Sequence, residues 1–231
     1  MLHAILPASG SATRMRGLPK FLLPCDDQYL SLLERHIENL LKYCDTIWVP
    51  VRPDLVPLVE SLRIPSERVV LLTMSTQSMT ETVRRVVDLS SGSRFVMVMP
   101  DTYFFGDLPY EYLAQSTSPM SLACWTIRPE QYGKLGQVLL ANPKSRGAMN
   151  EFIVAQSEDK NPECRFEHSW GAMAFDREVM GMAEDEMPHT GYLLQPLLSN
   201  SVEVAAKVMT GEYFDCGTPS EYLAMLKRTH P

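Results

Sequence analysis

The chain has 231 residues and a mass of 26.1 kDa, which is enough for one large domain or for one domain with a small insert. Its 21 Lys and Arg against 28 Asp and Glu give a formal charge of −7, which excludes general binding to the phosphate backbone of DNA or RNA. A hydrophobic fraction of 45% and a mean hydropathy of −0.11 exclude intrinsic disorder, and no apolar run approaches the about 20 residues that a membrane span needs.

The start of the chain and its five cysteines indicate a cellular compartment. The opening residues, MLHAILPASG, lack the basic segment and the long apolar stretch of a signal peptide. The cysteines are scattered, none forms a CxxC pair, and no two histidines have a zinc-type spacing. We therefore expect a reduced, cytoplasmic protein without a structural metal.

The first half of the chain, about residues 1–115, alternates short apolar runs with helical patterns. The last apolar run, RFVMVM, is typical of a central parallel strand that is covered on both faces. The β-α-β-α-β-α-β order predicts an α/β fold with a Rossmann-like, doubly wound, mostly parallel sheet. The expected strands are residues 2–7, 46–51, 68–72 and 94–99, and the expected helices are 29–43, 54–62 and 80–88, the last with Thr80 as its N-cap.

The second half, about residues 116–231, has shorter strand-like runs separated by loops rich in Pro, Gly and Asn. It contains no repeat, low-complexity tract or linker, so we expect a single domain, residues 1–231, whose halves share one mixed sheet. The expected strands are residues 120–127, 135–141, 151–156, 168–175 and 202–208, and the expected helices are 176–186, 191–199 and 219–228.

The most informative segment is ASGSATRMRGLPK, residues 8–20, directly after the first strand. Ligands of open α/β sheets bind at the carboxyl ends of the strands, and small side chains let backbone N–H groups approach phosphate oxygens. Two cations follow the small residues: the Arg14 guanidinium can fork onto two phosphate oxygens, and the Lys20 ammonium is a mobile point charge. The segment is neither a Walker loop nor a dinucleotide fingerprint, and a plain surface turn is the alternative interpretation.

This segment resembles the N-terminal signature of the nucleotidylyltransferases, which comprise sugar-1-phosphate nucleotidylyltransferases and related cytidylyltransferases. The matching features are the small-residue loop, Thr-Arg-Met, and Pro-Lys followed by FLLP, which we expect to be an apolar strand. Where the family loop usually reads Gly-Gly-x-Gly-Thr-Arg, this chain has Ser9 and Ala12 in place of two glycines. The resemblance implies a GT-A-like nucleotide-diphospho-sugar transferase fold with catalytic roles for Arg14 and Lys20. It also implies that the nucleotide is bound by Ala8, Ser9, Gly10, Ser11, Ala12 and Thr13.

A second match is QSMTET, residues 77–82, which falls where the family carries a Gln and a turn that read the base. The amide of Gln77 offers a paired donor and acceptor, which suits a pyrimidine edge. The resemblance implies that Gln77 and Thr80 contact the nucleotide. An ordinary helix N-cap is the alternative interpretation.

Two acidic residues match the family's metal ligands. Asp101 follows a buried apolar run, where packing does not explain a carboxylate and a hard cation that bridges phosphates needs an oxygen ligand. The segment GEYFDCGTPSEYLAML resembles the closing Asp-Val-Gly-Thr-Pro-x-x-Tyr of the family, which implies that Asp215 is the second ligand of a Mg²⁺ cofactor. In the same segment Thr218 suits the N-cap of the last helix and Pro219 its first position.

Weaker matches in the second half concern the binding site of the acceptor, the phosphate monoester to which this family transfers a nucleotidyl group. KLGQV resembles the family's sugar-site strand, and EDKNP resembles a Glu-Lys-Pro turn that gives a carboxylate to sugar hydroxyls and a Lys to the sugar phosphate. The alternative interpretation of EDKNP is a charged surface turn. The alternative interpretation of Trp170 is an indole packed in the core. The resemblance implies that the acceptor is bound by Gly136, Asp159, Lys160, Trp170 and Gly171, with the region around residues 190–192 as the next candidate.

The resemblance implies a Mg²⁺-dependent enzyme of EC 2.7.7 type. It would transfer a nucleotidyl group from a nucleoside triphosphate to a small phosphate monoester, chiefly a sugar 1-phosphate, and release an NDP-sugar and pyrophosphate. Its partners would be these two substrates, without nucleic acid or membrane. The base, the acceptor and any assembly of identical chains remain open.

Other functions also remain open. One is a cytidylyltransferase that acts on a non-sugar phosphate or phosphonate, such as phosphocholine, and another is a non-catalytic relative that binds nucleotide sugars. A metal-dependent glycosyltransferase is disfavoured, because the chain has Asp-Thr-Tyr at residues 101–103 rather than an Asp-x-Asp pair.

Overall fold

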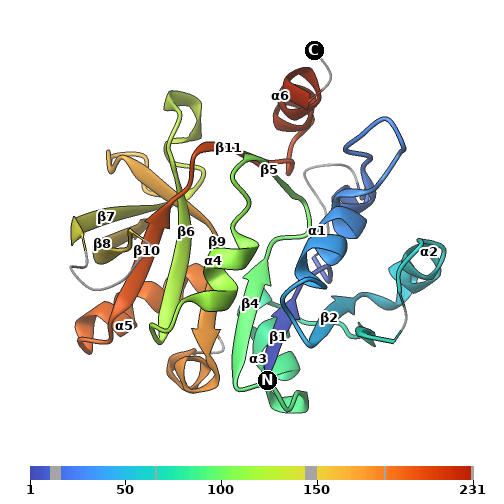
Figure 1. The fold of residues 1–231 in the computed structure, drawn as a ribbon, viewed down its shortest axis with the longest axis horizontal. Helices are drawn as coiled ribbons and strands as arrows, with labels where there is room; N and C mark the ends of the chain where they lie inside the picture. The colour runs from blue at the N-terminus through green and yellow to red at the C-terminus, as the bar shows by residue number, and fades with distance from the viewer. Residues whose placement is uncertain (11–16, 66, 144–149, 185, 230–231) are drawn as a thin grey trace.

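The computed structural model describes residues 1–10, 17–65, 67–143, 150–184 and 186–229. These residues build a nine-stranded mixed sheet with the order β3-β2-β1-β4-β9-β6-β10-β8-β7, and a separate two-stranded ribbon of β11 and β5. Figure 1 shows that the sheet strands of the two halves lie on opposite sides of the molecule, with β4 and β9 between them, and that α6 lies above α1. The prediction that both halves share one mixed sheet is therefore confirmed. The expectation that this sheet is mostly parallel is wrong, because within the described residues four of its strand pairings are parallel and five are antiparallel.

The first half forms the parallel part of the sheet. Alternate side chains of the central strand β4 enter two different cores: Phe95 and Met97 pack with α3, and Val96 and Val98 pack with α1. Helices therefore cover both faces, as the apolar run predicted. The elements are β1 (Leu2–Ile5), α1 (Leu32–Leu40), β2 (Thr46–Val51), α2 (Val56–Glu60), β3 (Val69–Thr73), α3 (Met79–Leu89) and β4 (Arg94–Val98).

The second half adds antiparallel pairs to the same sheet. Strand β9 runs antiparallel to both β4 and β6 and so joins the halves. None of the helices within the described residues is long and apolar enough to cross a membrane. The elements are α4 (Tyr110–Gln115), β6 (Met120–Thr126), β7 (Gly136–Pro143), β8 (Phe152–Asp159), β9 (His168–Asp176), α5 (Leu194–Ser199), β10 (Val204–Val208) and α6 (Pro219–Thr229).

The ribbon of β5 (Thr102–Gly106) and β11 (Gly211–Asp215) was not predicted from the sequence. Gly106 and Gly211 end it with positive φ angles of 92° and 105°, and a Cβ on Gly211 would run into the carbonyl oxygen of Phe105. Only glycine fits this close backbone approach. The register pairs Asp215 with Thr102, which brings two distant segments of the chain together beside Asp101.

Three local predictions were wrong. FLLP is not a strand, because Lys20–Leu22 form a 3-10 turn between two prolines that cannot donate to a strand ladder. The helix expected at 176–186 is a 3-10 segment, Arg177–Met182, in which a glycine weakens the α-helical preference. The N-cap of α3 is Ser78 and not Thr80, because the Ser78 side chain accepts the Glu81 N–H at 3.0 Å.

Candidate active site

A cavity of about 390 Å³ lies where the four parallel strands end. Each strand contributes the residues that follow it: 8–10 after β1, Arg52 after β2, 76–77 after β3 and 99–101 after β4. Lys20, from the 3-10 turn Lys20–Leu22, also lines the cavity. This is the edge at which open α/β sheets bind ligands. The predictions for Ser11, Ala12, Thr13 and Arg14 concern residues outside the described part of the chain.

The predicted nucleotide-binding residues divide into two groups. Ala8, Ser9, Gly10 and Gln77 line this cavity, and the exposed Gln77 has its backbone N–H held by Glu81 Oε2 at 2.8 Å. Thr80 is fully buried in the first turn of α3 and is not among the residues that line the cavity. The structure therefore does not bring Thr80 to the site.

The carboxylates of Asp101 and Asp215 lie on neighbouring chain segments beside the cavity. The Cys216 N–H donates to the Asp101 carbonyl oxygen at 3.0 Å, which extends the β5–β11 pairing to these residues. The Gly217 N–H donates to Asp215 Oδ1 at 3.0 Å. Two residues that are far apart in sequence are thus fixed through backbone hydrogen bonds.

Lys20 places its ammonium group against both carboxylate-bearing segments. Its Nζ lies 3.0 Å from Asp101 Oδ2, and the two side chains are only 12% and 17% exposed. A Cβ on Gly217 would lie 2.7 Å from Asp215 Oδ1 and 3.4 Å from Lys20 Nζ, so glycine leaves room for both groups. Lys20 therefore offsets a concentrated negative charge.

The negative charge of this region also acts on Tyr213, which packs against Phe104 and Trp125. Burial raises the pKa of the Tyr213 phenol well above its ordinary value, and the charges of Asp215 and Asp101 raise it further. Tyr213 therefore remains a neutral phenol at physiological pH.

The residues present fit a hard divalent cation. Mg²⁺ is commonly held by one or two carboxylates, with the phosphates of the substrate and water completing its shell. Asp101 and Asp215 supply two such carboxylates, and Asp101 already pairs with one positive charge, the Lys20 ammonium. Among the described residues no group of three or more His, Cys, Asp or Glu could hold a metal by itself.

A second cavity, of about 140 Å³, lies on the other side of Asp101 and is lined by that residue as well. Of the predicted acceptor residues, Gly136, Asp159, Lys160 and Trp170 line this cavity. The first cavity and the second also share Met79 and Met99, so the two meet beside the carboxylates. A third cavity, of about 240 Å³, shares Asp159 and Trp170 with the second.

The Trp170 indole is wedged between two glycines. A Cβ on Gly136 would overlap its Nε1, and a Cβ on Gly191 would lie 2.5 Å from its Cζ2. Gly171 has a different role, because a Cβ there would lie 2.6 Å from the Tyr213 ring. Gly171 makes room for the core and is not among the residues that line the cavity.

Sequence reasoning missed three polar residues of the site. Arg52 lines the first cavity and donates to the Gly10 carbonyl oxygen at 3.4 Å. Lys134 and His189 line the second cavity, where Lys134 supplies a positive charge in addition to that of Lys160. Arg52 directly follows a predicted strand, which is a usable signal, and His189 directly precedes residues 190–192, the next predicted candidate region for the acceptor.

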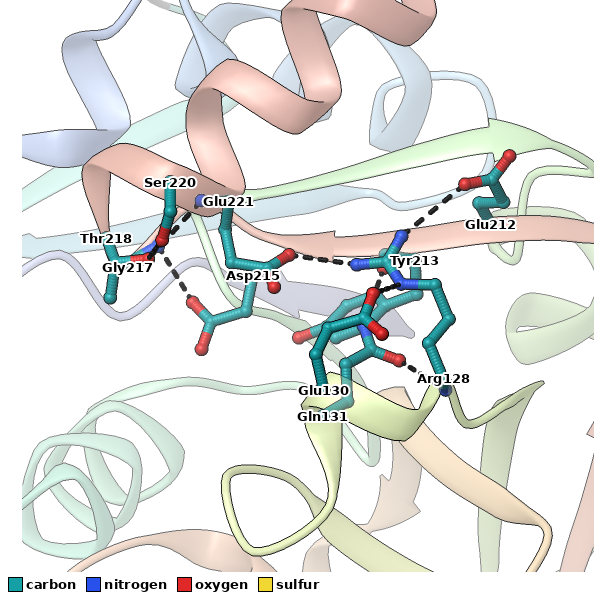
Figure 2. Close-up of polar contacts among 10 residues, drawn as sticks. All are labelled: Arg128, Glu130, Gln131, Glu212, Tyr213, Asp215, Gly217, Thr218, Ser220 and Glu221. Carbon is teal, nitrogen blue, oxygen red and sulfur yellow. Dashed lines mark hydrogen bonds and ion pairs between the residues drawn. The ribbon is translucent and has the colours of Figure 1, made fainter.

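Arg128 braces the segment that carries Asp215, as Figure 2 shows. The guanidinium lies 4.8 Å from the Phe214 ring centroid and forms ion pairs with three carboxylates. Its partners are Glu130 at 2.9 Å, Glu212 at 3.4 Å and Glu221 at 2.9 Å. The loop after β6 is thereby tied to both β11 and α6.

No family model matches the chain, and no curated protein sequence matches it. Solved structures do resemble it. UTP-bound UGPase from Acinetobacter baumannii has 16% identity and a TM-score of 0.76, over 99% of this chain and 93% of that one. UDP-glucose pyrophosphorylase complexed with UDP-glucose has 14% identity and a TM-score of 0.78, over 99% and 98% of the two chains.

The inositol-1-phosphate CTP transferase from T. maritima is a further similar structure, with 14% identity and a TM-score of 0.73. The match covers 99% of this chain and 96% of that one. At such identities the likeness concerns the fold, so the chain shares the α/β fold with a mixed sheet of these nucleotidylyltransferase structures.

Proposed function

We propose that the protein transfers a nucleotidyl group from a nucleoside triphosphate to a small phosphate monoester and releases pyrophosphate. The observation that carries this proposal is the position of Asp101, Asp215 and Lys20 at the junction of two cavities. One cavity lies at the carboxyl ends of the parallel strands, where a triphosphate would bind. The other is lined by Lys134 and Lys160, which suit the phosphate of an acceptor.

The two substrates are both anions, so the residues of the chain must chiefly neutralise and align them. In this proposal Lys20 contacts the phosphate at which substitution occurs, and Arg14 holds the leaving pyrophosphate. Lys160 binds the acceptor phosphate, and the small residues Ala8, Ser9 and Gly10, which line the first cavity, let backbone N–H groups approach the triphosphate. No side chain needs to remove a proton, because a phosphate monoester is already ionised near pH 7, with a second pKa of about 6.

A Mg²⁺ ion held by Asp101 and Asp215 would neutralise phosphate charge when bound. Asp101 and Asp215 then fix negative charge at the junction of the cavities, and Lys20 supplies a positive charge beside Asp101. This assignment is supported by the backbone hydrogen bonds that hold both aspartates and by the Lys20 ammonium beside them.

We further propose that the second half is the acceptor-binding lobe of a GT-A-like fold, and that a sugar or polyol 1-phosphate is the acceptor. The similar structures support both acceptor types: one is complexed with UDP-glucose, and another is an inositol-1-phosphate CTP transferase. Trp170 would then provide a flat apolar face for a ring, with Asp159 beside it as a hydrogen-bond acceptor.

The test is a matrix of four nucleoside triphosphates against phosphate monoesters, scored by pyrophosphate release with and without Mg²⁺. The monoesters are hexose 1-phosphates, inositol 1-phosphate and phosphocholine. We expect at least one pair to give turnover that requires Mg²⁺ and that is lost in Asp101→Asn. The absence of release from every pair, with the nucleotide still bound, would instead support a non-catalytic nucleotide-binding protein.

A further inference from the structure

Three hydroxyl groups meet at the start of α3, beside the larger cavity. Thr82 Oγ1 lies 3.0 Å from the Ser78 carbonyl oxygen. It also lies 3.0 Å from Ser9 Oγ and 2.5 Å from Thr76 Oγ1. The Thr82 side chain is buried, whereas Ser9 and Thr76 are partly exposed and line the cavity. The hydroxyl groups therefore form one network that reaches the wall of the cavity from inside the fold.

The Ser78 carbonyl oxygen fixes the directions of these hydrogen bonds. A carbonyl oxygen can only accept, so the single hydroxyl proton of Thr82 must be the one that is donated to it. Thr82 Oγ1 then has two lone pairs and no further proton, and it can only accept from its other two neighbours. One arrangement thus makes all three contacts hydrogen bonds: the hydroxyl groups of Ser9 and Thr76 both donate to Thr82.

These directions decide what Ser9 and Thr76 can offer to a ligand. Each hydroxyl group has one proton, and that proton is already donated, so toward the cavity both oxygens are hydrogen-bond acceptors. Because both lie close to the same atom of Thr82, the two oxygens are no more than about 5.5 Å apart. The two N–H groups of a planar amino group diverge by about 120° and reach acceptors at about 2.9 Å, so they bridge oxygens about 5 Å apart. Ser9 and Thr76 are therefore close enough to accept both hydrogens of one amino group.

The wall at Ser9 and Thr76 is distinct from the place where phosphates would bind. Thr76 follows β3 and Asp101 follows β4, and β2 and β1 lie between these two strands. The Lys20 ammonium is 3.0 Å from Asp101. Oxygens whose protons are already donated repel a phosphate oxygen, so an anion suits the Lys20 end of the cavity and an N–H donor suits the other. Gln77, next to Thr76, also lines the cavity and has an amide that can pair with a ring nitrogen of a base.

We propose that Ser9 and Thr76 select a nucleotide whose base carries an amino group at position 4 of a pyrimidine or position 6 of a purine. The proposal rests on the proposed transferase function and names the class of its nucleotide. Cytosine and adenine present an amino group where uracil, thymine and hypoxanthine present a carbonyl oxygen, and that oxygen would face two acceptors. Thr82 is then a positioning residue, because it acts only by holding the protons of Ser9 and Thr76.

The first test measures nucleotide binding in the absence of an acceptor. Calorimetry with Mg²⁺ compares CTP with UTP and ATP with ITP, since the members of each pair differ in an amino or an oxo group and in the protonation of the adjoining ring nitrogen. We expect the amino member of a pair to bind at least about tenfold more tightly. Ser9→Ala and Thr76→Val should each reduce that preference at least about threefold, by weakening the amino member. Equal binding within both pairs would overturn the proposal.

Thr82→Val tests the directions of the hydrogen bonds. Without the Thr82 hydroxyl group, the protons of Ser9 and Thr76 can turn to the cavity and donate to a carbonyl oxygen. We expect this variant to bind UTP more tightly than the wild type does, and its preference for CTP to fall to within about threefold. Thr82→Ser keeps the hydroxyl group and should keep the wild-type preference. A folded Thr82→Val variant with an unchanged preference would refute the assigned directions.

The matched control for the hydroxyl deletions is Ser61→Ala. Ser61 is an exposed serine that follows α2 and is not among the residues that line the larger cavity, so its variant should keep the preference for CTP. A loss of preference in Ser61→Ala as large as that in Ser9→Ala would show that the effect is not specific to the network.

The ribose is the other source of hydrogen-bond donors in a nucleotide, and dCTP distinguishes it from the base. We expect dCTP to retain the preference over dUTP that CTP has over UTP. If dCTP instead binds the wild type as weakly as UTP does, and Ser9→Ala abolishes the difference between dCTP and CTP, the two oxygens bind the ribose and the proposal is wrong.

The binding and turnover measurements fail independently. A preference for CTP without pyrophosphate release from any monoester would refute the transferase function and leave the assignment of the base standing. Pyrophosphate release with equal binding of CTP and UTP, and of ATP and ITP, would refute the assignment of the base and leave the transferase function standing.

Discussion

Lys20, Asp101 and Asp215 form the most concentrated group of charges at the proposed reaction centre. The ammonium of Lys20 is 3.0 Å from Asp101 Oδ2, and both side chains are largely shielded from water. A divalent cation and Lys20 would then share the task of neutralising the two carboxylates and the incoming phosphates. Removing a carboxylate should therefore affect catalysis much more than it affects folding.

Asp101→Asn and Asp215→Asn should each lower kcat at least about a hundredfold, the scale seen when a preorganised charged group is lost. An amide has nearly the volume of a carboxylate, so the thermal unfolding midpoint should change little. The measurements are steady-state pyrophosphate release at saturating Mg²⁺ and thermal unfolding.

The matched control is Asp107→Asn, since Asp107 is an exposed carboxylate directly after β5, at the other end of the same ribbon. This variant should keep its activity. Near wild-type turnover in Asp101→Asn or Asp215→Asn would show that the altered residue is no metal ligand.

His36 is a buried residue whose protonation should limit stability in acid. Its Nε2 donates to the Thr102 carbonyl oxygen at 2.9 Å, and its Nδ1 accepts from the Tyr110 hydroxyl at 2.8 Å. Burial lowers the pKa of His36 to about 4, against an opposing effect of the Thr102 hydrogen bond. The folded protein therefore keeps a neutral His36 at pH values where the unfolded chain is protonated.

The pH dependence follows from this difference. The contribution of His36 is fully present above its unfolded pKa of about 6.5 and is lost as the pH falls towards about 4. Between about pH 7.5 and about pH 5 the wild type should lose about 2 kcal/mol of unfolding free energy through this group. His36→Gln should lack that part of the loss in urea titrations, and an identical pH dependence in both proteins would contradict the assignment.

At the scale of elements, the pattern of apolar residues along the chain predicted most strands of the sheet but did not predict the ribbon of β5 and β11. Strands of the parallel half, such as 46–51 and 94–98, were predicted to within one residue because continuous apolar runs mark buried strands. The ribbon strands TYFFG and GEYFD are short, and their pairing joins residues about a hundred positions apart. Local periodicity carries no information about such a pairing.

The site residues likewise divide into those that the sequence could predict and those that depend on the tertiary structure. Asp101, Lys20 and Gln77 lie where strands or their loops end, so strand ends and the family resemblance were sufficient to suggest them. Thr80 and Gly171 occupy matching positions in the sequence, but the fold buries both against the core. His189, which precedes the 3-10 turn Thr190–Leu193, was missed because its partner, Asp159, ends the distant strand β8 and only the tertiary structure brings the two together.

Arg128 links the loop after β6 to β11, which ends at Asp215, and to α6, which follows it. Arg128→Met should lower the unfolding free energy by about 1–2 kcal/mol, because three carboxylates lose a shared partner while much of the apolar stem is kept. It should also lower kcat, because β11 and α6 hold Asp215. Thermal unfolding and pyrophosphate release measure the two effects.

Arg228→Met is the matched control for this variant. Arg228 pairs with the same Glu212 at 2.8 Å, but its side chain is 52% exposed, and exposed ion pairs contribute little. A loss of stability as large as that of Arg128→Met would show that the shared carboxylate, and not the bracing by Arg128, determines the effect.

At the scale of the whole molecule, one continuous sheet carries two adjoining cavities. The strands of the first half end at the larger cavity, and the smaller cavity is lined by residues of both halves, with Asp159 and Lys160 from the second. Strand β4 pairs with β9 over five residue pairs and so joins the two halves in one sheet. Side chains from opposite ends of the sheet can therefore be aligned without a hinge, and each substrate should depend on its own half.

The resulting prediction is that substitutions in the two halves separate the two substrates. Lys160→Gln should raise the acceptor KM about 10- to 150-fold, because it removes a charge-assisted contact worth about 1.5–3 kcal/mol, and should spare the triphosphate KM. Gln77→Ala, at the larger cavity, should do the opposite and raise only the triphosphate KM. Both variants are made at exposed side chains, so their unfolding midpoints should stay close to that of the wild type. If Lys160→Gln weakens the triphosphate and spares the acceptor, the smaller cavity is not the acceptor site, and the division of the sheet between the substrates is wrong.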